Sequence, residues 1–274
     1  MEFLNIKKYK DTYNFEIKGD PNKGLDKSII NGIRRTLLSN INSVGIPDVI
    51  IDKNNTSIHN EFIKQRISLI PLFLDPTEYK NDYLFILDVS NDGESIKKIT
   101  TNDFNIFPII NENKCKEELT KADFDLTKPL SEKLKKKIFK PFIIDNLENY
   151  ILITELKNTN SDTETQSLIL HAIPSVGVAH SHSLFNHLSC ITYSFHKDNN
   201  IFKKALQNEI KINKIPPKEQ KEFSKDYELA NAERYYHRDI FNEPYWYDFK
   251  ITSNHFRDSK NVFIYSINKL ITRF

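Results

Sequence analysis

The chain has 274 residues, of which 39% are hydrophobic and 28% are charged, and its formal net charge at pH 7 is +2. This length suits about two domains, and the composition is too apolar for a disordered polymer. A charge this close to neutral gives little attraction to nucleic acid, which disfavours a stand-alone DNA-binding protein. No apolar run reaches the roughly 18 to 20 residues of a membrane span, and residues 1–10 are too mixed for a signal peptide.

The cysteine content also limits the class of protein. Cys115 and Cys190 are the two cysteines, and they lie far apart in sequence. Two such residues make neither a zinc ribbon nor a disulfide framework by themselves. We therefore expect a protein that stays in solution in a reducing, intracellular compartment.

The first part of the chain predicts strands around one clear helix. Residues 3–18 alternate loosely between apolar and polar side chains, which predicts a strand or hairpin. Asp26 is a suitable helix N-cap, and the helix should end before Gly45 and Pro47. A short strand at 49–51 and a second helix at 60–68 follow. The apolar residues that recur at helical spacing in the first helix are Ile29, Ile30, Ile33, Leu37, Leu38 and Ile41.

The rest of the chain predicts mainly strands, followed by a C-terminal helix. Residues 114–140 are dense in lysine and acid and predict a solvated helix or loop. The polar stretch 197–243, which contains Pro216 and Pro217, is expected to be irregular. Strand-like runs occur at 84–89, 150–156, 167–173, 189–195 and 245–251. At the end of the chain, helical spacing recurs in Phe263, Ile264, Ile267, Leu270, Ile271 and Phe274.

No motif for catalysis is convincing. Gly19 and Gly24 have the spacing of a phosphate-binding loop, but Leu25-Asp26 follows where that loop needs Lys and Ser or Thr. Asp123 and Asp125 form the closest acid pair in the lysine-rich middle, where a solvated surface explains them best. We therefore expect no catalytic residue in this chain.

One group of side chains offers zinc ligands. His180 and His182, with His187 and Cys190 behind them, carry nitrogen and sulfur atoms of the right type. Their spacing matches no standard zinc site. A loop whose histidines make ordinary hydrogen bonds is the preferred interpretation.

The apolar helices near the two ends of the chain have two interpretations. Their apolar faces are either ordinary core or an interface shared with another subunit, and periodicity alone does not separate these. Arg34 and Arg35 lie beside the apolar stripe of the first helix, where a solvated helix face is the simplest explanation.

Three groups of sequence segments match known motifs, the third more weakly. Residues 31–38, NGIRRTLL, followed by Ile46-Pro47, fit the pattern N-x-L-R-R-x-L-L. Residues 54–58 and 61–72, NNTSI and EFIKQRISLIPL, fit N-x-T/S-x-hydrophobic and D-E-F-I-x-H-R-L-G-L-I-P-L. Weaker matches are ITTNDF at 99–104, to V-x-S-x-D-L, and GVAHSHSLF at 177–185, to G-I-x-K-x-H-A-K-W. In this order the segments resemble the α-type assembly subunits of multisubunit DNA-dependent RNA polymerases, which include the bacterial α, archaeal D and eukaryotic third-largest subunits.

The resemblance implies an α+β fold with a discontinuous dimerisation domain, made of a sheet and two helices and interrupted by an inserted, mainly β domain. The expected bounds are 1–48 and 183–274 for the dimerisation domain and 49–182 for the insert. The implied function is a non-catalytic assembly subunit of a DNA-directed RNA polymerase. Such a subunit heterodimerises with a smaller α-like subunit and docks the second-largest and largest subunits, so nucleic acid is contacted only through the complex.

The resemblance also implies two sets of site residues. Those expected at the dimer interface are Ile29, Ile30, Ile33, Leu37, Leu38, Phe263, Ile267, Leu270 and Ile271. Those expected to contact the large subunits are Arg34, Arg35, Glu61, Arg66, His182 and Phe185.

The chain departs from the family pattern at several positions. The insert lacks the cysteine cluster with which some relatives bind zinc or an iron–sulfur cluster, so we expect no metal and no cofactor. The family histidine and glycine of H-R-L-G are Gln65 and Ser68, and the lysines and tryptophan of the last motif are His180, Leu184 and Phe185. We expect a less charged contact with the second-largest subunit there.

The missing cysteines and the bias to Asn, Lys and Ile favour the polymerase of a large cytoplasmic DNA virus. The protein would then act in the host cytoplasm or virion, whereas a cellular eukaryotic form would be nuclear. The helical pattern still runs at Phe274, so the smaller partner is either separate or fused beyond this residue.

Two other functions remain open from the sequence. An independent nucleic-acid-binding module would use the lysines of 133–140, but Phe139 is the only aromatic residue among them. A metal-dependent hydrolase would use the histidine group at 180–190.

Overall fold

The computed structural model describes residues 2–80, 82–91, 93, 95–110, 119–158, 165–186, 188–231, 233–253 and 258–272. The chain mixes helices and several sheets, which confirms the predicted α+β class. It divides into two compact units. The terminal unit contains residues 1–38, 188–253 and 258–274, and the central unit contains residues 39–187 and 254–257.

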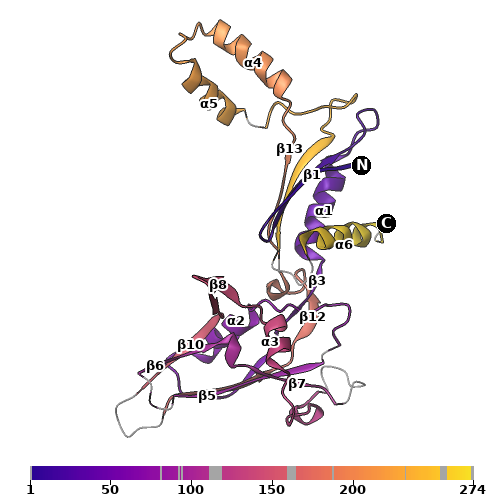
Figure 1. The fold of residues 1–274 in the computed structure, drawn as a ribbon. Helices are drawn as coiled ribbons and strands as arrows, with labels where there is room; N and C mark the ends of the chain where they lie inside the picture. The colour runs from indigo at the N-terminus through magenta and orange to yellow at the C-terminus, as the bar shows by residue number, and fades with distance from the viewer. Residues whose placement is uncertain are drawn as a thin grey trace. The chain divides into compact units, whose positions relative to one another are not determined.

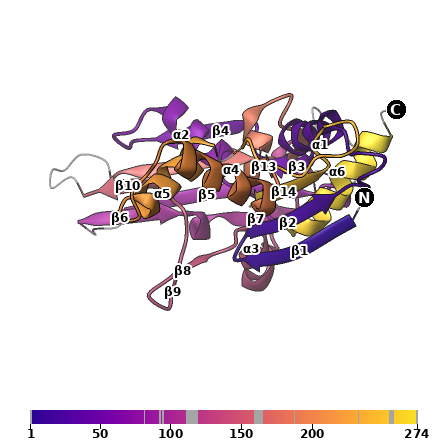
Figure 2. The same cartoon turned by 90° about the horizontal axis from the view of Figure 1, so that it is seen from above.

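The terminal unit is built on one antiparallel sheet and the helices α1 (Lys27–Ser39) and α6 (Ser259–Ile271). The strand order is β1-β2-β14-β13, so the beginning and the end of the chain pair directly. Figures 1 and 2 show both helices beside this sheet. The strands are β1 (Glu2–Tyr9), β2 (Thr12–Lys18), β13 (Leu188–Phe195) and β14 (Trp246–Ser253).

Aromatic rings from distant parts of the sequence form much of the core of the terminal unit. The rings of Phe15 and Phe249 stack with centroids 5.5 Å apart, and Phe263 of α6 meets Phe15 edge-on at 4.9 Å. The buried Tyr247 hydroxyl donates toward the carbonyls of Leu25 and Pro244, at 2.7 and 2.8 Å. These contacts hold the start of α1 and β14 together.

The predicted N-cap of the first helix is confirmed. The Ser28 amide donates to Asp26 Oδ1 at 2.7 Å, directly before α1. This backbone hydrogen bond is also the main reason why the pKa of Asp26 is lowered.

The expectation of an irregular stretch at 197–243 is wrong for residues 199–212 and 220–230, because two helices form there. They are α4 (Asn199–Ile212) and α5 (Gln220–Ala230), with Pro216 and Pro217 in the turn between them (Figure 1). Asp198 caps α4, its Oδ1 accepting from the amides of residues 200 and 201. Buried Phe202 packs against the rings of Tyr227 and Tyr235, whose hydroxyls lie 2.6 Å apart.

In its described residues, the central unit contains a four-stranded sheet of order β4-β11-β5-β7 and three two-stranded pairs. The four strands are β4 (Val49–Asn54), β11 (Ser167–Ala172), β5 (Tyr83–Ser90) and β7 (Asn105–Pro108). The pairs are β3 (Asn42–Gly45) with β12 (Ser175–Val178), β6 (Ile96–Thr100) with β10 (Leu152–Lys157), and β8 (Phe142–Ile144) with β9 (Leu147–Asn149). Its α-helices are α2 (Asn60–Ser68) and α3 (Glu132–Ile138).

Helix α2 has the predicted bounds. The structure also confirms, within a residue or two at their ends, the strands expected at 84–89, 167–173, 189–195 and 245–251. The strand expected at 49–51 is confirmed as β4, which continues to Asn54. The apolar core of the central unit joins Ile63 and Ile67 of α2 to Leu87 and Leu170 of the sheet. Within the described ranges, no helix is long and apolar enough to span a membrane.

Candidate dimerisation and docking surfaces

Helices α1 and α6 come from opposite ends of the chain and meet at a small residue. Gly32 of α1 faces Leu270 of α6, and a Cβ added at Gly32 would lie 3.6 Å from Leu270 Cδ2. Helix α6 turns Val262 and Phe263 into the core, together with Ser259 and Ser266. The two predicted apolar helices are therefore neighbours in one unit.

The residues expected at the dimer interface divide by burial. Ile30, Ile33, Leu37 and Phe263 are at most 4% exposed, so they already pack in the core of their own unit. Leu38, Ile267 and Leu270 are half-buried. Ile29 and Ile271 are 47% and 65% exposed. The exposed and half-buried residues are the ones that another subunit can still cover, and their part in dimerisation stays a prediction.

The solvent side of α6 carries an apolar stripe. Ile264, Ile267 and Ile271 recur at spacings of three and four, which places them on one face of the helix. That face differs from the one that buries Val262 and Phe263. A cavity of about 300 Å³ lies beside Ile264 and is lined by Phe3 and Ile6 of β1. We call Phe3, Ile6, Ile264, Ile267 and Ile271 the outer apolar surface.

Arg34 and Arg35, expected to dock the large subunits, lie on α1. Arg34 is half-buried and its Nε donates to Asn31 Oδ1 at 3.1 Å, within the same helix. Arg35 is exposed. The docking roles of both arginines stay predictions.

Glu61 and Arg66 are exposed on α2, and local contacts hold both. Glu61 pairs with Lys64 at 3.2 Å, and its amide donates to Nδ1 of the N-cap His59. Arg66 Nη2 donates to the carbonyl of Leu152 at 3.0 Å, which ties α2 to β10. Arg66 therefore has a structural contact in addition to its expected docking role.

The departures from the family pattern at the end of α2 fit the turn found there. The Ser68 hydroxyl donates to the carbonyl of Gln65 at 2.8 Å. The backbone of Ser68 does not have a positive φ, and the C-cap Leu69 has a φ of −87°. This turn needs no glycine.

His182 is the N-cap of a short 3₁₀ helix, Ser183–Phe185, after β12, and Phe185 is the last residue of that helix. His182 is exposed, and its Nδ1 accepts from the Leu184 amide at 3.2 Å. Phe185 is buried: a Cβ added at Gly177 would lie 2.3 Å from its Cε2 atom. Phe185 therefore fills a space that glycine leaves open in β12, and its docking role stays a prediction.

The histidine group considered for zinc does not form a cluster in the described part of the chain. His180 and His182 are exposed and Cys190 is a half-buried free thiol. His187 and Cys115 lie outside the described residues. Among the described side chains, a different set, Glu16, His196 and Asp248, has atoms close enough together to hold a metal ion.

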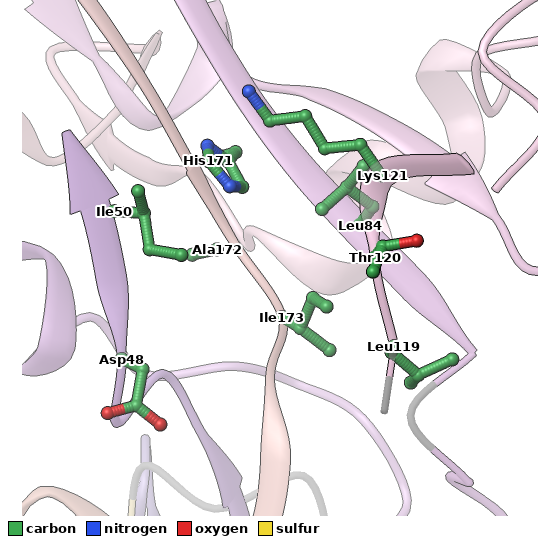
Figure 3. Close-up of a pocket in the computed structure, with 9 residues that line it drawn as sticks. All are labelled: Asp48, Ile50, Leu84, Leu119, Thr120, Lys121, His171, Ala172 and Ile173. Atoms are coloured by element: carbon green, nitrogen blue, oxygen red, sulfur yellow. The ribbon is translucent and has the colours of Figure 1, made fainter. Parts of the chain in front are cut away.

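A cavity of about 540 Å³ in the central unit has an apolar wall formed by Ile50, Leu84 and Ile173 and a polar rim that includes Lys121 and His171 (Figure 3). Both polar side chains bond to Asp52 of β4, with Lys121 Nζ at 2.8 Å and His171 Nδ1 at 3.0 Å from Oδ2. The hydrogen bond from Lys121 is the largest cause of the lowered pKa of Asp52. No sequence motif marks this cavity.

Comparison with known proteins finds several RNA polymerase subunits among the relatives of this chain. No protein-family model matches the chain. The mouse DNA-directed RNA polymerases I and III subunit RPAC1 is 31% identical over 74 residues, which are 26% of this chain and 20% of the mouse protein. The Arabidopsis thaliana DNA-directed RNA polymerases II, IV and V subunit 3 is 25% identical over 232 residues, 81% of this chain and 67% of that protein.

The resemblance to α-type RNA polymerase assembly subunits is confirmed. A second Arabidopsis thaliana protein of the same kind, DNA-directed RNA polymerases IV and V subunit 3B, is 37% identical over 70 residues. The chain matches only about a fifth of the length of this protein and of the mouse one.

Proposed function

We propose that this protein is a non-catalytic assembly subunit of an intracellular DNA-directed RNA polymerase. It heterodimerises with a smaller α-like subunit and docks the two large catalytic subunits. The names of its relatives as polymerase subunits support this proposal. The absence of a convincing catalytic motif in the sequence agrees with a role in assembly.

The observation that carries the proposal is the pairing of α1 with α6 beside an apolar surface that the described residues leave exposed. The outer apolar surface includes Phe3 at 44%, Ile264 at 47% and Ile271 at 65% exposure. Covering side chains of this size contributes about 1.5–3 kcal/mol each when burial is complete. Several of them on one face suit the apolar core of an obligate interface, which buries about 2,000 Å² or more.

The test replaces two exposed isoleucines of α6. The variant carrying Ile264→Asp and Ile271→Asp should keep its fold and lose the smaller α-like subunit when the polymerase complex is purified. Charges placed at the centre of an apolar interface lose their hydration without gaining a partner. Ile33→Asp is a poor probe, because Ile33 is 2% exposed and the change would disrupt the unit itself.

The chain offers a matched control on other helices. Ile212 of α4 and Leu229 of α5 are 72% and 80% exposed, and neither belongs to the outer apolar surface. Aspartate at both positions should leave the heterodimer intact. Retention of the small subunit by the α6 variant would overturn the dimerisation role, as would equal loss in the control.

Docking of the large subunits is tested separately at Arg35. Charge reversal by Arg35→Glu should release the second-largest subunit from the complex while the heterodimer remains. Arg66 is less suitable, since its contact with the Leu152 carbonyl also ties α2 to β10. Loss of both partners together in Arg35→Glu would contradict a separate docking role.

The alternative function, an independent nucleic-acid-binding module, would use the lysines at 133–140, and the contacts of these lysines speak against it. Lys135 pairs with Glu132 and also donates to the carbonyl of Asn102. Lys136 pairs with Glu148. These pairs offset part of the positive charge on α3 that such a module would present to phosphates.

A further inference from the structure

The sheet of the terminal unit has a second face, which carries a polar cluster. Side chains alternate along β14, so Tyr247 and Phe249 enter the core and Asp248 points to the other side. Glu16 of β2 is the direct cross-strand partner of Asp248. His196 follows β13, and its Nδ1 lies 2.8 Å from Asp248 Oδ1. All three residues are half-buried.

Two carboxylates directly opposite each other on neighbouring strands repel, which is unfavourable unless a positive group lies between them. Another histidine–carboxylate pair of the chain shows the contrast. His171 bonds to Asp52 at 3.0 Å, and the third member of that group is the cation Lys121. In the cluster on β2 and β14, the third member is a second acid, Glu16.

Neighbouring side chains fix the carboxylate and the imidazole. Asn5 Nδ2 donates to Glu16 Oε1 at 2.8 Å, and Trp246 Nε1 donates to Oε2 at 3.1 Å. The indole of Trp246 also stacks on the His196 ring with centroids 4.1 Å apart. Such outer contacts orient the ligands in protein metal sites.

We propose that Glu16, His196 and Asp248 bind a divalent transition-metal ion of the zinc type. One imidazole and two carboxylates suit such an ion, whereas magnesium and calcium prefer oxygen ligands alone. Nitrogen and oxygen ligands at about 2.1 Å from one ion lie about 3.0–3.4 Å apart. The ligand atoms of the three residues lie within 4.8 Å of one another, so modest side-chain rotation closes the site.

The surroundings leave room for further ligands. A cavity of about 760 Å³ borders Glu16 and Asp248, and its lining includes Ser194, Glu233 and the two cations Lys7 and Lys250. Water can complete the coordination from this side. The ion would offset the repulsion of the two acids and join β2 to β14 and the residue after β13. It would stabilise the unit that holds α1 and α6.

This site differs from the one excluded by sequence reasoning. The expectation of no metal rested on the cysteines missing from the inserted domain, whereas these ligands lie on the sheet of the terminal unit. The proposal also stands independently of the polymerase function, because it rests on the geometry of three side chains.

The test uses the full chain, stripped with a chelator and titrated with ZnCl₂ or CoCl₂. Trp246 is the only tryptophan of the protein, so its fluorescence reports this site alone. We expect a saturable change with one equivalent of Co²⁺, competition by Zn²⁺, and a rise in the melting temperature with Zn²⁺. Glu16→Gln, Asp248→Asn and His196→Gln should each weaken binding by about tenfold or more.

His171→Gln is the matched control, since it removes an imidazole–carboxylate pair whose third member is a lysine. It should bind Co²⁺ as the unchanged protein does. The proposal is overturned if Trp246 shows no saturable response at millimolar metal. It is equally overturned if the three ligand variants bind as tightly as the control, and their melting temperatures without metal show whether each is folded.

Discussion

Gly32 of α1 and Leu270 of α6 face each other with room for one methyl group between them. A Cβ added at position 32 would lie 3.6 and 3.9 Å from the two methyl carbons of Leu270. These are ordinary van der Waals distances. Glycine inside a helix costs about 0.5–1 kcal/mol relative to alanine. The two helices therefore meet without needing glycine at this position.

We predict that Gly32→Ala raises the free energy of unfolding by about 0.5–1 kcal/mol. Urea unfolding of the variant and the unchanged protein measures the difference. The same variant should keep its partner subunit, since the added methyl group lies between the two helices. A loss of stability would show that the two helices pack more closely than the 3.6 Å separation allows.

The opposite result is expected at Gly177. A Cβ there would lie 2.3–2.6 Å from three carbons of the Phe185 ring, closer than carbon atoms approach. Gly177→Ala should destabilise the protein by about 1–3 kcal/mol through overpacking. Thermal or urea unfolding measures this loss, and adding Phe185→Leu should recover part of it. Unchanged stability in Gly177→Ala would contradict the burial of Phe185 against β12.

The Asp52 group predicts a dependence of stability on pH. The hydrogen bond from Lys121, followed by that from His171, lowers the pKa of Asp52 below its ordinary value of 3.8. A carboxyl with a lowered pKa in the folded state stabilises the protein above its unfolded pKa, and this contribution is lost as the pH falls through the folded pKa.

Lys121→Met should therefore cost stability near pH 6 and have little effect well below pH 3.8. Both side chains are more than a third exposed, so the cost should stay below about 1 kcal/mol. Urea unfolding across this pH range compares the variant with the unchanged protein. An equal difference at all pH values would show that Lys121 acts by packing rather than by its charge.

Local patterns predicted much of the fold, and long-range packing decided the rest. Asp26 was predicted as a cap and α2 as a helix because both depend on neighbouring residues. Helices α4 and α5 were missed because their sequences are polar. Phe202, Leu206 and Ile210 do recur at a spacing of four in α4, but Pro216 and Pro217 favour the prediction of a loop.

The candidate sites show the same limit. Helical periodicity assigns both Ile33 and Ile271 to apolar helix faces and does not distinguish them. Only the fold shows that Ile33 is 2% exposed and Ile271 is 65% exposed. Glu16, His196 and Asp248 could not be grouped from sequence, since strand pairing across most of the chain brings them together. Phe185 matched a motif position, and its burial follows from glycines that only the structure places beside it.

The central claim is that the outer apolar surface meets a smaller α-like subunit. Site-specific photo-crosslinking in the purified polymerase tests it most directly, with a photoreactive residue at position 264 and a control at position 229. The account predicts a crosslink from 264 to the smaller α-like subunit and none to that subunit from 229. A crosslink from 264 to a large subunit alone, or the same crosslink from both positions, would contradict it.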